Sequence, residues 1–186
     1  VPSLDAGDEP MFQAINRPHP YISFEGMVNG LIDFRREFPG KYWLEVFIIG
    51  GYTAIPDELE KIVRYVRRIN PDRVQLNTVT RPPAEDYALA VSADRLAELA
   101  KLFQPEAEVI ADFRGVHRQA EFIAGQADVL EMLRRRPCSL EDIAAGLEMH
   151  RNEVIKYLEE IRAEKLLEES IVAGKVYYSA SQAVTT

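Results

Sequence analysis

The first half of the chain alternates between helix-like and strand-like hydrophobic patterns. Apolar residues recur at helical spacing after Ser23, Pro56 and Ser92, which predicts helices with one apolar side each. Short, mostly apolar runs lie around these segments. The predicted strands are residues 1–4, 42–49, 74–79 and 108–111. Because strands and helices alternate with short connections, we predict an α/β fold with a parallel sheet and right-handed crossovers.

The strand predicted at residues 42–49 is almost continuously apolar and runs into Gly50 and Gly51. Such a run is typical of a strand buried on both faces, as in a parallel sheet covered by helices. The chain opens on another strand-like stretch, and the loop after it leads to Asp8, a predicted helix cap. Four strands are only part of an eight-stranded barrel. We therefore expect a truncated chain that holds the later half of a parallel β/α barrel; a small self-contained α/β domain is the alternative.

The second half of the chain predicts a different, smaller domain. Helical patterns lie around Val129–Leu133, after the capping residue Ser139, and over residues 152–164. A β-hairpin then turns at residues 173–175. Helices followed by a hairpin are typical of a winged helix. The predicted organisation is a partial barrel over residues 1–115, a linker over 116–125, a winged helix over 126–182 and a tail over 183–186.

Special residues cluster where the predicted strands end, which is where parallel barrels carry their functional groups. A carboxylate suits a sugar diol because it accepts two hydrogen bonds, and a carboxamide suits a heterocycle because it both donates and accepts. Glycines allow a ligand or another backbone segment to approach closely. The candidate binding residues are Ser3, Asp5, Gly50, Gly51, Gln75 and Asn77.

Each candidate also has a purely structural explanation. Asp5 could cap the helix that follows Gly7. Gly50 and Gly51 could form only a tight turn. Asn77 could satisfy neighbouring backbone groups. It is their combination at one barrel rim that favours a binding site, because any one of them has an ordinary role elsewhere.

The composition of the chain excludes several kinds of functional site. The chain has 186 residues, a net charge of −8 and one cysteine, Cys138. A single cysteine excludes an intramolecular disulfide framework and a cluster held by several thiolates of this chain, and it fits a reducing cytoplasm. His19, His117 and His150 show no metal-binding spacing, so we predict no metal site. No apolar run is long enough to cross a membrane.

Three segments resemble the later barrel strands of the radical S-adenosylmethionine superfamily. They are VPSLDAGDEPMFQAINRPHP, LEVFIIGGYTAIPDELEKI and PDRVQLNTVTRPP, and the resemblance spans about residues 1–112. They are most similar to the iron–sulfur oxidoreductase branch related to tRNA-wybutosine synthesis enzymes. The resemblance implies that Ser3 and Asp5 contact the ribose of S-adenosylmethionine, and that Gly50 and Gly51 pack near its adenine. It also implies that Gln75 and Asn77 contact the adenine or the substrate.

The chain departs from that superfamily in one respect. Its members hold a [4Fe–4S] cluster with a CxxxCxxC loop after the first strand, and this chain has no such loop. The resemblance therefore implies S-adenosylmethionine and the cluster as cofactors of an intact parent enzyme, which forms a radical that abstracts hydrogen from a substrate. For this piece alone we expect no bound cofactor, no catalytic residue and no activity. Its expected partner is the missing half of the barrel, or a second copy paired along the exposed sheet edge.

The alternative function is a regulator, with a ligand-sensing α/β domain fused to a DNA-binding winged helix. The predicted recognition helix, residues 152–164, contains Lys156 and Arg162 but four glutamates. A helix in the major groove normally brings donors and basic flanking residues to the DNA. We therefore expect the winged helix to contact protein rather than DNA.

Overall fold

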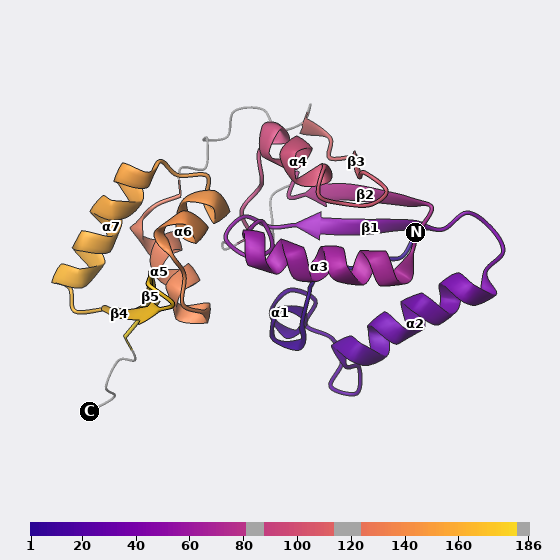
Figure 1. Ribbon diagram of the computed structural model, residues 1–186, viewed down its shortest axis with the longest axis horizontal. Coiled ribbons are helices and arrows are strands. Elements are labelled where there is room, and N and C mark those ends of the chain that lie inside the picture. The colour runs from indigo at the N-terminus through magenta and orange to yellow at the C-terminus, as the bar shows by residue number, and fades with distance from the viewer. Residues whose placement is uncertain (81–87, 114–123, 182–186) are drawn as a thin grey trace. The chain divides into compact units, whose positions relative to one another are not determined.

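The computed structural model describes residues 1–80, 88–113 and 124–181, and the chain divides into two compact units, Val1–His117 and Arg118–Thr186 (Figure 1). Residues 81–83 at the end of the third segment that resembles the superfamily, most of the predicted linker and the predicted tail lie outside the described residues. The domain boundaries at residues 115 and 126 stay predictions. No helix in the described part of the chain is both long and apolar enough to cross a membrane.

The first unit contains a parallel sheet of three strands in the order β1-β2-β3. The strands are β1 (Trp43–Ile48), β2 (Arg73–Thr78) and β3 (Glu108–Val109). The opening segment adds a short parallel pairing to the free side of β1, because Leu4 N–H donates to Glu45 O and Glu45 N–H donates to Pro2 O, each at 2.9 Å. The predicted parallel α/β arrangement is confirmed, whereas a barrel stays a prediction.

Helices form where the sequence supplies caps and an apolar side. They are α1 (Glu9–Ile15), α2 (Phe24–Glu37), α3 (Pro56–Ile69) and α4 (Ala93–Ala100). Asp8, Ser23 and Ser92 cap α1, α2 and α4 by accepting from backbone N–H groups of the first turn. Pro56 opens α3, where its missing N–H has no helical partner to lose. These helix starts are all as predicted.

The core lies on one face of the sheet. Alternate residues of β1 and β2 are buried in one apolar cluster with residues of α3 and α4, and Figure 1 shows these helices alongside the strands. The strand residues in this cluster are Leu44, Val46, Ile48, Val74 and Leu76, each 0% exposed. The intervening residues of β1 are only half-buried. The prediction that β1 is buried on both faces is therefore wrong: its other face carries Glu45 and stays partly open.

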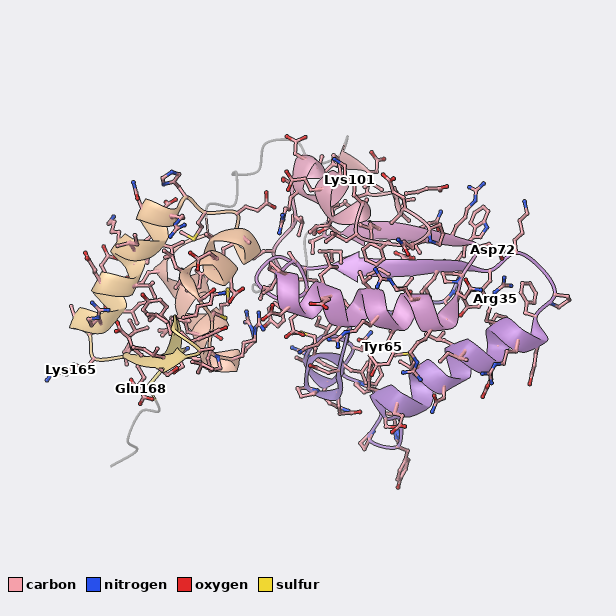
Figure 2. All side chains as sticks on the ribbon, in the orientation of Figure 1. Arg35, Tyr65, Asp72, Lys101, Lys165 and Glu168 are labelled. Atoms are coloured by element: carbon pink, nitrogen blue, oxygen red, sulfur yellow. The ribbon has the colours of Figure 1, made fainter. Side chains whose placement is uncertain are left out.

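A polar anchor ties α2 to the start of the sheet. Arg35 forms an ion pair with Asp72 at 3.3 Å (Figure 2) and donates through Nε to Asn70 O at 2.9 Å. The second oxygen of Asp72 accepts from Tyr42 N–H at 2.7 Å. The carboxylate of Asp72, which follows α3, thereby connects the last turn of α2 to Tyr42, the residue before β1.

The second unit is built from α5 (Gln126–Arg135), α6 (Leu140–Gly146), α7 (Arg151–Ala163) and a hairpin of β4 (Leu167–Val172) and β5 (Lys175–Ala180). Ser139 caps α6 in a capping box with Asp142, as its position in the sequence indicates. The hairpin turns at Ala173 and Gly174, both at positive φ. Cys138 and Tyr178 exchange backbone hydrogen bonds at 2.8 Å, so β5 pairs on two sides. The order of helices and hairpin is confirmed, and the winged-helix assignment stays a prediction.

A matched pair of glycine substitutions tests the packing of the first unit. A Cβ at Gly7 would lie 2.4 Å from Lys61 Cβ and 3.0 Å from Ile62 N, because the loop before α1 lies directly against α3. We expect Gly7→Ala to lower the free energy of unfolding by about 1–3 kcal/mol. Urea unfolding followed by the fluorescence of Trp43 measures this change.

Gly30→Ala is the control, because nothing lies within 4 Å of a Cβ built there and the residue is inside α2. That change should raise the free energy of unfolding by up to about 1 kcal/mol, since alanine has the higher helix propensity. A Gly7→Ala protein as stable as the wild type would contradict the described packing.

Candidate functional site

The half-buried face of the sheet carries most of the sequence-predicted site residues. Strand register aligns Ser3 with Glu45, Glu45 with Gln75, and Gln75 with Glu108. Asn77 lies on the same face as Gln75, two residues further along β2. The polar sheet face, as we call it from here, consists of Ser3, Asp5, Glu45, Gln75, Asn77 and Glu108.

Asp5 is fixed at the edge of this face by two hydrogen bonds. Its Oδ1 accepts from Phe47 N–H and its Oδ2 accepts from Asn16 Nδ2, each at 3.1 Å. The helix after it is capped by Asp8 instead, whose Oδ1 accepts from Met11 N–H at 3.0 Å. The alternative that Asp5 caps this helix is therefore wrong, because its carboxylate links the opening segment to β1.

Burial raises the pKa of Asp5 above its ordinary value. The hydrogen bonds from Phe47 and Asn16 act in the opposite direction and lower the pKa, and the nearby charge of Glu45 raises it further. Because the raising effects prevail, the environment of Asp5 disfavours a negative charge. A neighbouring hydrogen-bond donor or positive charge would relieve this cost.

Asn77 is already engaged within the sheet. Its Nδ2 donates to Glu45 Oε1 at 3.0 Å, and its Oδ1 accepts from Thr78 N–H at 2.9 Å. The structural explanation for Asn77, that it satisfies neighbouring backbone, therefore applies to its oxygen. Its amide nitrogen instead orients the carboxylate of Glu45 across the face.

Gln75 is the carboxamide best placed to meet a ligand. It lies between Glu45 and Glu108 in the register and is half-buried, and its side chain makes no hydrogen bond to any residue that the structure describes. The hydroxyl of Ser3 lies in the same row at an exposed position. Gln75 and Ser3 thus offer donor and acceptor atoms that the described residues leave available.

The glycines after β1 are explained by the chain itself. Gly50 N–H donates to Leu89 O at 2.9 Å, and a Cβ at Gly50 would lie 3.1 Å from Leu89 Cβ. Gly51 has a φ of 71°, a conformation that side chains disfavour. Both glycines are therefore needed for the turn at the end of β1 and for the approach of residues 89–90. They shape one end of the polar sheet face without requiring a ligand.

Glu45 is the residue that sequence reasoning missed. It lies between Asp5 and Asn77, influences the pKa of the first and accepts from the second. The run of apolar residues around it made the strand look buried on both faces. The signal was nonetheless present, because a charged residue in the middle of such a strand requires a polar or open environment.

The residues of this chain do not fit an iron–sulfur cluster. Cys138 belongs to the second unit, is buried, and directs its Sγ towards Arg136 O at 3.5 Å. Burial raises its pKa to about 11, so it is a thiol near neutral pH rather than the thiolate that metals bind. Within the ranges described, no group of three or more His, Cys, Asp and Glu could hold a metal ion.

Comparison with known proteins yields relatives that are all longer than this chain. No family model matches it. It is 34% identical over 184 residues to a protein named GTPase Obg from Brachyspira hyodysenteriae, covering 97% of this chain and 27% of the relative. It is 28% identical to UPF0026 protein MJ1312 of Methanocaldococcus jannaschii, over 54% of this chain and 31% of the relative. A UPF0026 protein of Helicobacter pylori is 25% identical, over 96% of this chain and 56% of the relative.

Two solved structures are similar in part. A radical SAM methyltransferase from Sphaerobacter thermophilus has a TM-score of 0.49 and 18% identity, covering 63% of this chain and 35% of that one. NolR from Sinorhizobium fredii has a TM-score of 0.28 and 22% identity, covering 30% of this chain and 55% of that one. At these TM-scores neither likeness establishes a shared fold.

The environment of Asp5 predicts how it titrates. Because the pKa of Asp5 is raised in the folded protein, the contribution of this group to stability is complete below the ordinary pKa of about 3.9. That contribution is lost as the pH rises through the pKa of Asp5 in the folded protein. NMR titration of the side-chain carboxyl carbon should give a midpoint above the ordinary value, and Glu45→Gln should lower it.

Glu108→Gln is the matched control. It removes a carboxylate from the same face, but Glu108 is on β3, two strands further from Asp5 than Glu45 is. It should leave the titration of Asp5 unchanged. A midpoint at or below the ordinary value in the wild type would show that Asp5 is not desolvated.

Proposed function

We propose that the first unit supplies the later strands of a radical S-adenosylmethionine enzyme, and that its polar sheet face binds the nucleoside part of this cofactor. The observation that carries the proposal is the available carboxamide of Gln75, in register with Ser3 and Glu45 on one half-open face. The three sequence segments that resemble the superfamily contain every residue of this face except Glu108. A parallel sheet with one helix-covered face and one polar face also suits the interior of a barrel.

Each residue has a role that follows from its hydrogen bonds. Gln75 can donate to and accept from the edge of an adenine ring, and Ser3 can bond to a ribose hydroxyl. Asp5 and Asn77 are positioning residues, because their side chains already hold Phe47, Asn16 and Glu45 in place. In the complete enzyme, S-adenosylmethionine would supply the radical that abstracts hydrogen from a substrate. Within the complete enzyme this chain would help to bind and orient the cofactor, and we assign no catalytic group to its described residues.

The cluster in this proposal is held outside these 186 residues, because their single cysteine is buried and protonated. The chain spans between 27% and 56% of the length of the curated relatives it matches. The activity of a whole protein therefore depends on segments beyond this one. Three closely spaced cysteines in the same polypeptide or in a partner chain would complete the site.

The name GTPase Obg does not lead us to propose nucleotide hydrolysis for this chain. GTP-binding domains hold phosphates with a glycine-rich segment that ends in Gly-Lys-Ser or Gly-Lys-Thr. This sequence contains no such segment.

For the second unit we propose a protein-contacting winged helix. The basic side chains of α7 that a DNA reader would use are engaged by carboxylates. Arg162 forms an ion pair with Glu169, Lys156 lies 3.8 Å from Glu160, and Arg151 lies 3.1 Å from Glu141. Pairing of this kind neutralises the positive potential that attracts a phosphate backbone.

The role of Gln75 is tested in the natural polypeptide that contains this chain, purified without oxygen and with its cluster restored. Gln75→Ala should weaken binding of S-adenosylmethionine roughly fivefold to tenfold, because one or two ligand hydrogen bonds are lost. Equilibrium dialysis with the radiolabelled cofactor measures this. Residues 1–186 alone should show no saturable binding.

Gln13→Ala makes the same chemical change at an exposed position on α1, where Gln13 bonds only to Glu9 among described residues. Its affinity should equal that of the wild type. Equal affinity in the Gln75→Ala protein, or a natural polypeptide that does not bind S-adenosylmethionine, would refute the proposal.

The second unit should not bind DNA. Fluorescence anisotropy with a labelled random duplex should show no saturable, salt-sensitive binding at micromolar protein concentrations, because the basic residues of α7 are paired. Replacing their partners in a Glu160→Gln/Glu169→Gln variant should increase attraction to the duplex. Micromolar binding by the wild type would favour the regulator alternative.

A further inference from the structure

A pocket lies on the helical side of the first unit. It has a volume of about 350 Å³ and is lined by Gly7, Asp8, Lys61, Arg64, Tyr65 and Arg68. Most of this lining belongs to α3, whose opposite side is buried against the sheet. We call it the α3 groove. It is separate from the polar sheet face, because none of its lining residues belongs to that face.

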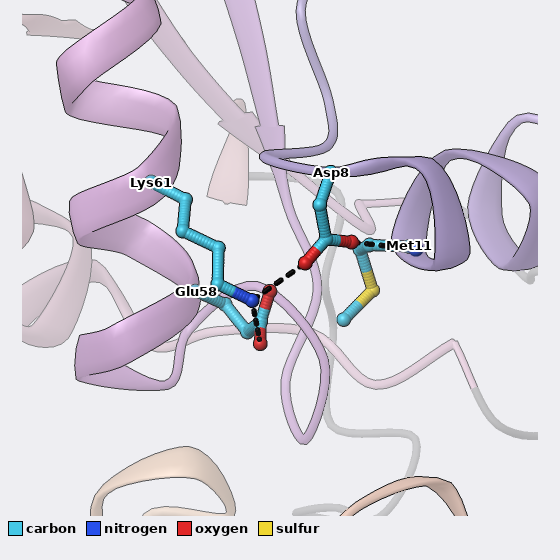
Figure 3. Close-up of polar contacts among 4 residues, drawn as sticks. All are labelled: Asp8, Met11, Glu58 and Lys61. Atoms are coloured by element: carbon cyan, nitrogen blue, oxygen red, sulfur yellow. Dashed lines mark hydrogen bonds and ion pairs between the residues drawn. The ribbon is translucent and has the colours of Figure 1, made fainter. Parts of the chain in front are cut away.

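Lys61 lines the α3 groove together with Asp8. Its Nζ lies 2.6 Å from Asp8 Oδ2 and 2.9 Å from Glu58 Oε1 (Figure 3). Burial acts to lower the pKa of Lys61, but the two carboxylates prevail and raise it, so the ammonium group stays charged. One ammonium group therefore faces two carboxylates, so Lys61 has no positive charge to spare for a ligand and the cluster keeps a negative charge.

Arg64 and Arg68 are in a different situation. They lie four residues apart on one side of α3, about 6 Å along the helix axis. Both are exposed, and neither forms an ion pair with any carboxylate in the described part of the chain. Elsewhere in the first unit Arg35, Arg36 and Arg95 each pair with an acidic residue. The α3 groove thus carries positive charge that the described residues leave uncompensated, in a chain whose net charge is −8.

Tyr65 gives the α3 groove a fixed apolar wall. Its ring meets the ring of Phe24 edge-on at 5.0 Å, and the guanidinium of Arg68 lies 5.2 Å from its centre. The label in Figure 2 marks this side chain between α3 and α2. A cation–π contact of this kind restricts the motion of the Arg68 side chain.

We propose that the α3 groove binds a small phosphorylated ligand, with its phosphate held between Arg64 and Arg68. Guanidinium groups match phosphate oxygens with paired hydrogen bonds, and two of them compensate a dianion. The volume lies in the range of small-molecule sites. Asp8 and Glu58 beside Lys61 would repel a polyanion that extended along the groove, so a compact ligand fits better than a nucleic acid.

The arginines near the end of α3 also have an explanation that involves no ligand, and the experiment has to distinguish it from phosphate binding. Basic residues near a helix C-terminus interact favourably with the helix dipole, and α3 ends with Arg67 and Arg68 close to that terminus. Arg67 is exposed but does not line the α3 groove. Arg67 therefore serves as a control that shares the dipole but not the pocket.

The test is isothermal titration of the full 186-residue chain with inorganic pyrophosphate at low ionic strength. Arg64→Gln/Arg68→Gln should weaken binding about tenfold or more, since charge-assisted hydrogen bonds are lost. Arg67→Gln/Lys101→Gln removes the same charge from exposed positions outside the groove and should change affinity less than twofold. Circular dichroism of both variants confirms that each is folded.

Three results would overturn the proposal. The first is a wild-type chain that shows no saturable binding of pyrophosphate. The second is equal weakening in the groove variant and in the control variant, which would mean nonspecific attraction. The third is binding of a labelled 12-nucleotide RNA that depends on Arg64 and Arg68 while pyrophosphate does not bind, which would assign the groove to nucleic acid.

Discussion

The backbone pairing of the opening segment with β1 determines which residues of the first unit enter the apolar core and which lie on the polar sheet face. Two hydrogen bonds at 2.9 Å join Pro2 and Leu4 to Glu45, and the parallel register then continues through β2 to β3. Because side chains alternate across a strand, this register fixes which residues enter the apolar core and which remain on the other face. Leu4, Leu44 and Val74 are buried, so Ser3, Glu45 and Gln75 must face the other way.

The polar sheet face is organised by carboxylates whose hydrogen bonds hold the chain in place. Asp5 connects the opening segment to Phe47 and Asn16, and Glu45 accepts from Asn77. These contacts stiffen the face and leave Gln75 as the carboxamide available for recognition. A site with pre-positioned neighbours loses less conformational entropy when a ligand binds. The same arrangement explains why Gln75 is a better probe of binding than Asp5, whose removal would also disturb the sheet.

The two faces of the first unit differ in charge as well as in packing. The polar sheet face carries Asp5, Glu45 and a Glu108 that pairs with Arg73, whereas the α3 groove carries Arg64 and Arg68. Beside these arginines Lys61 pairs with Asp8 of the loop before α1 and with Glu58 of α3. The unit can therefore present opposite charges to different ligands, although the chain as a whole is acidic.

Local signals in the sequence determined most of the secondary structure. Ser23, Ser92 and Ser139 begin helices because their side chains accept from the first turn, and Pro56 begins one because it needs no donor. The parallel α/β order and the terminal hairpin follow from the succession of such elements. The predicted positions of Gln75 and Asn77 on one face needed only the alternation of a strand.

Only the tertiary structure decided which faces of the sheet are covered and which polar groups meet. Glu45 was hidden in an apolar run, because strand burial depends on what packs against it and not on its own composition. The roles of Gly7, Gly50 and Asp5 depend on partners far away in the sequence, namely Lys61, Leu89 and Phe47. The α3 groove likewise requires the loop before α1 to lie against α3, a long-range contact that no local pattern encodes.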